Sequence, residues 1–386
     1  TKYRDYKINT SLDPMVFNMN NDIQVNEGAI EKDAFNWDTI RPYELTEKEK
    51  NIYRMVDSIK NIPVFKTLED IVALMVNYYY VIGDFEIGPY HTMYSYNPIE
   101  GNRFRLGGRT SNEFSTKLMI SGYGAYGTLD EKFKYGLGFM YMCSKNPRRS
   151  FGANYEHDIQ QLAQSHNAFM EDNILSSFLR RNPNYKLTLV NEFNAFYEHE
   201  WYQGFSNTLT FNHKEIFSTA HVPFIKQDTE GNIESLNSVI ASEISIATRF
   251  AYNEKFLMGE FERVSLGSKF PIAEFTATFG LKGIWQGEYD YLRFDFNLSD
   301  KIETSPVGFF KYKLKTGKII GDLPYPLLEL HKGNETYAFD YFAFNMMNYY
   351  EFASDTWVSL FAEHHFQGFF LNHIPLLRKL QWREVV

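Results

Sequence analysis

Three short segments carry side chains that could do chemistry: two could bind a metal ion or transfer a proton, and the third could bind an anion. They are Glu198-His199-Glu200, Glu363-His364-His365 and the arginine-rich stretch from Arg103 to Arg109. Carboxylates and imidazoles ligate zinc and act as general acids and bases. Neighbours on a strand point to opposite faces, so within each acid and histidine set only two side chains can converge, such as Glu363 with His365. No His-Glu-x-x-His spacing or cysteine pair is present, so we predict no metal, no cofactor and no catalytic residue.

The arginines form a row on one face of a predicted strand, opposite Phe104 and Leu106. Such a row could attract an anion or a lipid headgroup. The alternative, which we favour, is an internal ladder in which acids of neighbouring strands neutralise the guanidinium groups. The candidate cluster of inward-facing charges is Arg103, Arg105, Arg109, Glu243, Arg249, Arg293, Asp295, Glu363 and His365.

Five closely spaced glycines are a second candidate for ligand binding. They are Gly122, Gly124, Gly127, Gly136 and Gly138. A phosphate-binding loop needs a strand–loop–helix arrangement and a Lys-Ser or Lys-Thr pair after the glycines. This segment has neither. Glycine inside strands marks bends and close packing, so we predict a bending point of the sheet.

Alternation of apolar and polar residues is the dominant pattern in the elements that position these groups. Within 284–299, Leu292, Phe294 and Phe296 share one face, and Arg293 and Asp295 lie on the other. A strand with this pattern has one apolar and one polar face. In a soluble sandwich the apolar faces pair to form a core, whereas in a membrane barrel they contact lipid.

Strand length and number favour the membrane barrel. Many predicted strands exceed the 9–11 residues that cross a bilayer. Short links such as 128–130 alternate with long excursions such as 163–183, 218–234 and 318–336, as in outer-membrane barrels. The predicted strands are 84–96, 102–111, 113–126, 131–143, 150–162, 184–201, 203–217, 235–252, 268–282, 284–299, 303–317, 337–350 and 354–369.

Helical signals occur only before the strands. Residues 1–45 are polar and irregular. Thr46-Glu47-Lys48-Glu49 predicts a capped helix that ends at Pro63, and a second helix is predicted from Thr67. We therefore predict an all-β, antiparallel transmembrane outer-membrane β-barrel (84–386) after an N-terminal irregular and helical segment (1–83) that is periplasmic or plugs the barrel.

Composition agrees with this prediction. Aromatic residues make up 17% of the chain, and outer-membrane barrels place aromatics on the lipid face and in two girdles. The net charge of −9 argues against a nucleic-acid partner. No run approaches the roughly 18 apolar residues of a membrane-spanning helix, so we do not expect a helical bundle of the inner membrane. The single cysteine, Cys143, provides no disulfide framework.

One family resemblance rests on specific segments. The stretch Asn97-Pro98-Ile99-Glu100-Gly101-Asn102-Arg103-Phe104-Arg105-Leu106-Gly107-Gly108-Arg109-Thr110, with Gly122–Gly127 and Gly368–Asn372, resembles a family of Bacteroidota outer-membrane proteins named for a carboxypeptidase-regulatory-like domain. The resemblance implies an outer-membrane barrel of unknown function, preceded by a small periplasmic sandwich domain. Because barrels must close to hide their edges, we also expect the barrel to be incomplete at its C-terminal end.

These observations lead to one function and two alternatives. We expect a non-enzymatic scaffold or component of an envelope-biogenesis, assembly or secretion complex in the bacterial outer membrane. Its partners would be outer-membrane lipids and other outer-membrane or periplasmic proteins. The alternatives are a solute or ion pore and a hydrolase embedded in the barrel. Plugging by 1–80 or 318–336 would favour the scaffold, and an open lumen would favour the pore.

Overall fold

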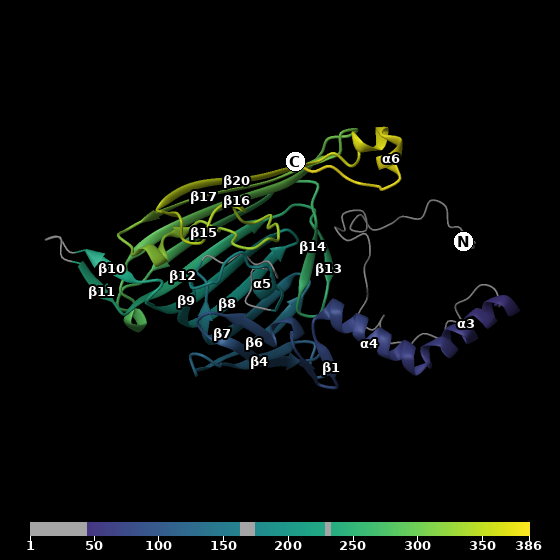
Figure 1. Ribbon diagram of the computed structural model, residues 1–386, viewed down its shortest axis with the longest axis horizontal. Helices are drawn as coiled ribbons and strands as arrows, with labels where there is room; N and C mark the ends of the chain where they lie inside the picture. Colours follow the sequence, from purple (N-terminus) through teal and green to yellow (C-terminus); the bar gives the residue numbers. More distant parts are fainter. Residues whose placement is uncertain (1–44, 163–173, 228–232) are drawn as a thin grey trace. The chain divides into compact units, whose positions relative to one another are not determined.

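The structure is a computed structural model that describes residues 45–162, 174–227 and 233–386 (Figure 1). Most of the segment predicted to be irregular, 1–44, lies outside the described residues. The chain divides into two units, Thr1–Tyr78 and Tyr79–Val386. Each unit is described by itself below.

The first described helix of the first unit, α3, spans Glu47–Lys60. It begins with the predicted capping box. The Thr46 hydroxyl accepts a hydrogen bond from the Glu49 N–H, and the Glu49 carboxylate accepts one from the Thr46 N–H at 2.8 Å. Two N–H groups that lack partners inside the helix are satisfied in this way, and the predicted helix start is confirmed.

The second helix, α4, spans Pro63–Asn77. The prediction that it starts at Thr67 is wrong. Pro63 lies in its first turn, where the missing proline N–H would have no partner in any case, so proline begins this helix as well as ending the previous one. Among the described residues, no helix combines the length and apolar composition needed to cross a bilayer.

The second unit is built on one antiparallel sheet of 14 strands. Its order is β1-β2-β4-β5-β6-β7-β8-β9-β12-β15-β16-β17-β20, and β3 also pairs with β4. The strands are β1 Tyr80–Ile82, β2 Phe85–Ile87, β3 Tyr94–Asn97, β4 Gly101–Thr110, β5 Leu118–Gly127, β6 Phe133–Lys145, β7 Arg148–Gln160, β8 Thr188–Tyr202, β9 Phe205–Phe217, β12 Ser238–Phe250, β15 Ile272–Gly280, β16 Tyr291–Glu303, β17 Phe309–Ile320 and β20 Thr356–His365. The prediction of a mostly β, antiparallel architecture is confirmed.

Shorter elements lie in the connections of the sheet. They are the strand pairs β10 Phe224–Gln227 with β11 Ile233–Leu236, β13 Lys255–Met258 with β14 Arg263–Gly267, and β18 Glu329–Leu330 with β19 Ala353–Ser354, the helices α5 Ile174–Leu179 and α6 Pro375–Arg378, and the 3-10 turns η2 Tyr90–Thr92, η3 Ile284–Gln286, η4 Tyr325–Leu327 and η5 Leu371–His373. Links at one end of the sheet, which we call the turn end, include the short turns 146–147, 203–204 and 304–308. The opposite loop end carries the long connections 161–187, 218–237 and 321–355. The short link at 128–130 lies at this same end, so its expected place opposite the long excursions is wrong.

The sheet has one charged and one apolar face, as the alternation predicts. On β6, the residues Phe133, Tyr135 and Leu137 are exposed, whereas Lys134 between them is completely buried. Strand register carries this division from strand to strand. Phe104 of β4, for example, faces Tyr126 of β5, which in turn faces Phe133. We call the face of Lys134 the inner face and the face of Phe133 the outer face.

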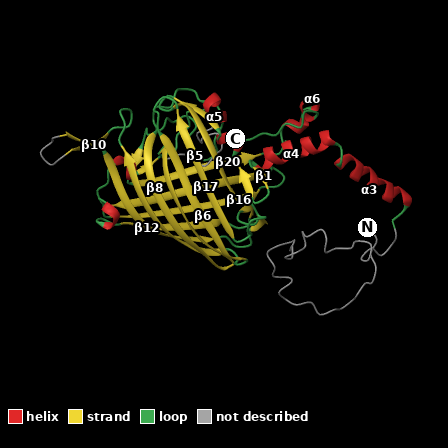
Figure 2. Cartoon of the chain, turned by 90° about the horizontal axis from the view of Figure 1, so that it is seen from below, coloured by secondary structure: helices red, strands yellow, loops and turns green. Residues whose placement is uncertain are grey.

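Figure 2 shows the long tilted strands of this sheet forming a curved wall. A contact across the inner face gives the sense of the curvature. Arg103 of β4 reaches Asp158 of β7 at 2.7 Å, although three strand spacings of a flat sheet amount to about 14 Å. The inner face is therefore concave. The edges of the described sheet are β1 and β20, and these two strands do not pair with each other, so the described sheet is not closed.

Several predicted strands differ from the structure. The segment 84–96 is interrupted by η2, and 284–299 becomes a strand only at Tyr291, because Gly283 adopts a φ of 84° and a 3-10 turn follows it. The segment 337–350 forms turns. There the Asn345 side chain accepts the Asp340 N–H and the Asp340 carboxylate accepts the Phe342 N–H, so side chains replace strand partners.

The connection between β17 and β20, residues 321–355, packs on the inner face, and we call it the inner segment. In Figure 1 this yellow-green stretch runs in front of the strands. Its Leu330 joins a buried cluster with Val190, Ile216 and Val239 from β8, β9 and β12. Tyr325 packs against the same cluster, and burial raises its pKa to about 12. An apolar core therefore fills the inner face at the loop end.

Candidate functional site

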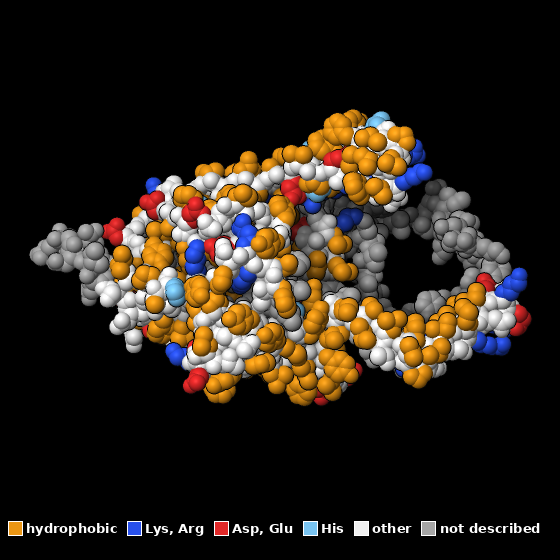
Figure 3. Space-filling model, in the orientation of Figure 1, with side chains coloured by type: hydrophobic (Ala, Val, Ile, Leu, Met, Phe, Trp, Pro, Cys, Tyr) orange, Lys and Arg blue, Asp and Glu red, His pale blue; other side chains and the backbone are white. Residues whose placement is uncertain are grey.

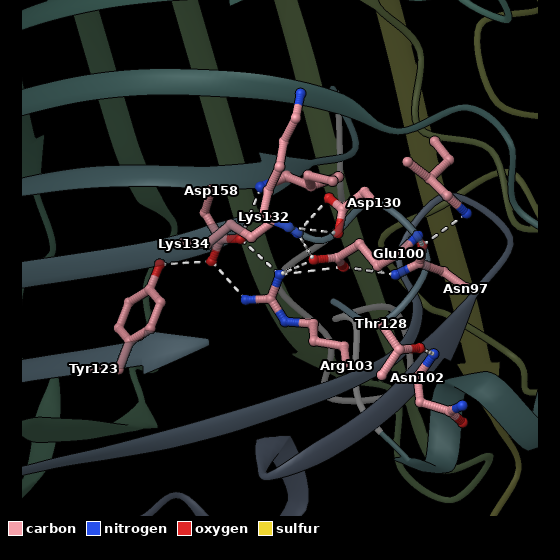
Figure 4. Close-up of polar contacts among 12 residues, drawn as sticks. Asn97, Glu100, Asn102, Arg103, Tyr123, Thr128, Asp130, Lys132, Lys134 and Asp158 are labelled. Atoms are coloured by element: carbon pink, nitrogen blue, oxygen red, sulfur yellow. Dashed lines mark hydrogen bonds and ion pairs between the residues drawn. The ribbon is translucent and has the colours of Figure 1, made fainter. Parts of the chain in front are cut away.

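Several of the most buried charges among the described residues form one network at the loop end of β4, β6 and β7, drawn in Figure 4. Arg103 donates two hydrogen bonds to Asp158, both at 2.7 Å, and a further one to Glu100 at 3.0 Å. Lys134 lies 2.7 Å from Glu100 and also pairs with Asp130. We call these five residues the Arg103 network. Its two cations and three carboxylates largely neutralise one another, as buried charges must.

Backbone geometry fixes the position of this network. The Asn97 side chain accepts the N–H groups of Ile99 and Glu100, which holds the β3–β4 turn, and Gly101 closes that turn at a φ of 70°. At Gly127 a Cβ atom would lie 2.9 Å from the Glu100 side chain and 3.0 Å from the Lys134 ammonium. This glycine leaves room for the ion pairs.

A second glycine makes room for an aromatic ring beside the network. The Tyr123 ring of β5 lies directly over Gly136 of β6, and its hydroxyl donates a hydrogen bond to Asp158 at 2.6 Å. The Arg105 guanidinium stacks 3.7 Å from the centre of the same ring. The structure therefore assigns these glycines a packing role at the inner face.

The other candidate charges lie in separate groups along the inner face. Arg109 pairs with Glu86 and Glu262, Arg249 with Glu254 and Glu274, and Arg293 with Asp295 and Glu329. Glu243 is partly buried and accepts a hydrogen bond from the Tyr291 hydroxyl. Glu363 pairs with His365 at 2.9 Å. All nine candidates lie on the inner face, but they make a row of ion-pair groups and not one cluster.

A belt of polar side chains links two of these groups. Between the Arg103 network and Glu243, Lys214 of β9 contacts Glu192 of β8 at 3.3 Å, and Asn212 donates to the same carboxylate at 2.7 Å. Asn212 is also the register partner of Glu243. Sequence reasoning did not select this belt.

Neither acid and histidine set forms a metal site. Glu198 and Glu200 are both engaged by Arg263, at 3.5 and 3.0 Å, and His199 lies on the opposite face against Trp201. Among the described residues, no group of three or more histidines, cysteines or acids could hold a metal ion.

Two chain segments cover the ends of the inner face. At the loop end, the inner segment is tied to residues before β8: Lys186 pairs with Glu335 at 2.9 Å, and the Tyr350 hydroxyl donates to the Lys186 carbonyl at 2.9 Å. At the turn end, the β13–β14 hairpin folds across three strands. Lys145, Arg148 and Arg109 contact Glu260, the Phe261 carbonyl and Glu262, respectively.

Sequence reasoning also missed a row of lysines on β17. Lys311, Lys313 and Lys315 alternate with Tyr312 and Leu314, so all three lie on one face, and their register partners on β20 include the inward-facing Glu363 and Ser359. The signal was a Lys-x-Lys-x-Lys pattern inside a predicted strand.

Comparison with known proteins gives a family match and distant similarities to solved structures. The model of a family of unknown function (DUF5686), C-terminal domain, matches residues 74–386. No curated protein matches the chain. The chain is similar to the crystal structure of BamA from Haemophilus ducreyi lacking POTRA domains 1–3, with 12% identity and a TM-score of 0.38. The similarity covers 62% of this chain and 43% of that one, so the chain spans less than half of that protein's length.

Proposed function

The chain belongs to the DUF5686 C-terminal domain family, whose function is unknown, and we propose that its sheet is the wall of a β-barrel in a bacterial outer membrane. We further propose that the protein is a non-enzymatic scaffold or component of an envelope-biogenesis, assembly or secretion complex. Its partners would be outer-membrane lipids and other envelope proteins. The resemblance of Asn97–Thr110 to Bacteroidota outer-membrane proteins supports this assignment.

The outer face is the observation that carries the membrane proposal. Apolar side chains are exposed there from β4 to β20, including Leu106, Leu137 and Val358, and Figure 3 shows such side chains (orange) over the region of β4 and β6. Eleven strands about 4.8 Å apart span roughly 50 Å, so a belt about 25 Å tall would cover on the order of 1,000 Å². Soluble monomers rarely expose contiguous apolar patches above a few hundred Å².

Aromatic side chains gather at both ends of this face, as they do in membrane girdles. Trp201, Tyr202 and Phe250 are exposed at the turn end. Phe133 and Trp285 are exposed at the loop end. Aromatic rings with a polar edge favour the interface between lipid and water, so these two groups mark the boundaries of the proposed membrane zone.

Coverage of the inner face favours the scaffold hypothesis rather than the hypothesis of an open pore. An apolar core that includes Leu330 of the inner segment fills the loop end, and the β13–β14 hairpin covers the turn end. The candidate charges are engaged in ion pairs, hydrogen bonds or ring contacts with neighbouring side chains, which favours a structural role over hydrolysis. We therefore keep the solute or ion pore as the second candidate and place the hydrolase third.

Single cysteines test the membrane proposal. Cys143 is the only cysteine, so a Cys143→Ser background allows Leu137→Cys on β6 and Leu360→Cys on β20 to be compared with Leu129→Cys in the β5–β6 turn. Leu137 and Leu129 are equally exposed, at 66% and 65%. In phospholipid vesicles, we expect a membrane-impermeant maleimide to label only position 129. Equal labelling at 137 and 129 would overturn the membrane assignment.

Conductance separates the scaffold from the pore. We expect the purified protein to give no large, stable conductance in planar bilayers, because the inner segment and the hairpin cover the inner face. A large, stable conductance of the unaltered protein would sink the scaffold proposal and favour the pore.

A further inference from the structure

Three lysines of the described inner face lack the carboxylate partners that Arg249 and Arg293 have. Lys313 and Lys315 lie two residues apart on β17, and Lys332 belongs to the inner segment. Within the described ranges, no carboxylate lies within ion-pair distance of these three ammonium groups, whereas Arg249 and Arg293 each contact two acids. Like charges held together without partners repel one another, so this arrangement needs a reason.

Aromatic rings bring the three lysines to one place. The Lys313 ammonium lies 4.6 Å from the centre of the Phe342 ring, and the Lys315 ammonium lies 5.9 Å from that of Phe361. Phe361 packs on Phe344 at 4.9 Å between ring centres. The Phe344 N–H donates to the Lys332 carbonyl at 2.8 Å, which anchors the backbone of Lys332 beside this aromatic cluster.

Three nearby acids are engaged elsewhere, and a fourth, Asp340, accepts the Phe342 N–H. Glu274 pairs with Arg249, Glu329 with Arg293, and Glu363 with His365. Burial lowers the pKa of Lys332, and the positive charge of Lys315 lowers it further. Glu329 opposes this effect, as does Asp340, but the net direction remains downward. Lys332 is therefore partly buried and close enough to Lys313 and Lys315 for their charges to act on it.

We propose that Lys313, Lys315 and Lys332 form a binding site for a multivalent oxyanion of the phosphate class. Ammonium groups bind phosphate as point charges, and three of them can surround a tetrahedral anion. All three side chains are only partly buried, so a ligand can reach them. Figure 3 shows Lys and Arg side chains (blue) grouped near the middle of this unit, where the yellow-green chain of Figure 1 runs in front of the strands.

The test measures pyrophosphate binding by calorimetry with the full chain in a non-ionic detergent. We expect Lys313→Gln/Lys315→Gln to weaken binding by roughly 100-fold, since each charge-assisted hydrogen bond contributes about a factor of ten or more. Lys318→Gln is the matched control, because it lies on the same strand with its side chain on the outer face, and it should bind like the unaltered protein. Should the double variant fail to fold, Lys332→Gln alone should weaken binding about ten-fold.

Thermal unfolding gives a second readout. Without anion, the double variant should unfold no lower than the unaltered protein, because it loses like-charge repulsion. Pyrophosphate should raise the unfolding temperature of the unaltered protein and of Lys318→Gln, but not of the double variant. Absence of binding to the unaltered protein, or equal binding by the double variant, would overturn the proposal.

Two probes distinguish the sources of the phosphate. Tighter binding of dihexanoyl phosphatidic acid than of glycerol 3-phosphate would assign the site to a phospholipid headgroup with part of its chains. Equal binding would assign it to a free phosphate compound. Since these measurements are made in detergent solution, their outcome is independent of the membrane and scaffold proposals.

Discussion

At the scale of single residues, the inner face is organised by pairing of charges. Arg103 and Lys134 are among the most buried cations of the described chain, and both contact Glu100. Removing water from a charge costs several kcal/mol, and only a partner of opposite sign offsets this cost. The pairs are therefore essential once the charges are buried, even where they add little net stability.

Lys134→Met tests this dependence. The substitution leaves Asp130 without its cation and Glu100 with Arg103 alone, so we expect the free energy of unfolding to fall by about 3–5 kcal/mol. Urea unfolding in detergent micelles measures the change. Lys132→Met is the control, because Lys132 is exposed two residues away and its loss should change stability by about 0.5 kcal/mol or less. Equal effects of the two variants would contradict the role of the Arg103 network.

At the scale of elements, each long strand has two faces with different requirements. Leu137 of β6 is exposed on the outer face, and Lys134 of the same strand is buried on the inner face. A shift of one residue in register would exchange these environments. The inner ion pairs and the apolar surroundings of the outer face therefore fix the register of the strands.

Leu137→Arg tests the environment of the outer face. A cation at the bilayer midplane costs about 2–4 kcal/mol, so we expect a loss of this size in vesicles. Leu129→Arg in the β5–β6 turn is equally exposed, and there we expect a change within about 0.5 kcal/mol. The same small change at both positions would argue for water at the outer face.

The C-terminal segment gives a prediction about pH. Burial disfavours ionisation of Glu384, but the N–H groups of Leu371, Gly368 and Phe370 donate to its carboxylate and lower its pKa below the ordinary 4.5. A lowered pKa contributes stability above pH 4.5 that is lost as the pH falls through the pKa of the folded state. We expect amide exchange of Gly368 and Phe370, corrected for its intrinsic pH dependence, to accelerate in acid. In Glu384→Gln, exchange of these amides should already be accelerated at neutral pH. Unchanged exchange in this variant would show that the Glu384 carboxylate does not protect them.

At the scale of the whole molecule, the inner segment decides whether the concave face is open. Its attachments include Lys186 with Glu335 and Tyr350, residues that come from two connections of the sheet. Such contacts between loops are weaker than those of the strands, so the segment is the part most open to release.

Lys186→Met/Tyr350→Phe should loosen the inner segment without changing a strand of the wall. We expect intermittent conductance in planar bilayers from this variant and none from Lys282→Met, which alters an exposed lysine in the β15–β16 turn. If the double variant gives no more conductance than the control, these contacts do not hold the inner segment in place.

The sequence by itself determined what depends on neighbouring residues. Alternation in Leu292–Phe296 predicts two faces because a strand repeats every two residues, and Thr46 with Glu49 predicts a helix start because both partners lie within one turn. The nine candidate charges share the inner face because they follow the same alternation. Local rules failed at 337–350, where Asp340 and Asn345 form turns with each other.

Only the tertiary structure decided which groups meet. Arg103 and Asp158 lie 55 positions apart, and Lys186 and Glu335 lie 149 apart. Such pairs depend on strand order, register and curvature, which no local pattern contains. The fold also decided which cations remain without acids: Arg293 received two carboxylates and Lys313 received none within the described chain, although both alternate with apolar residues in the same way. The difference arises because long-range packing of the inner segment brings Glu329 to Arg293 and aromatic rings to Lys313.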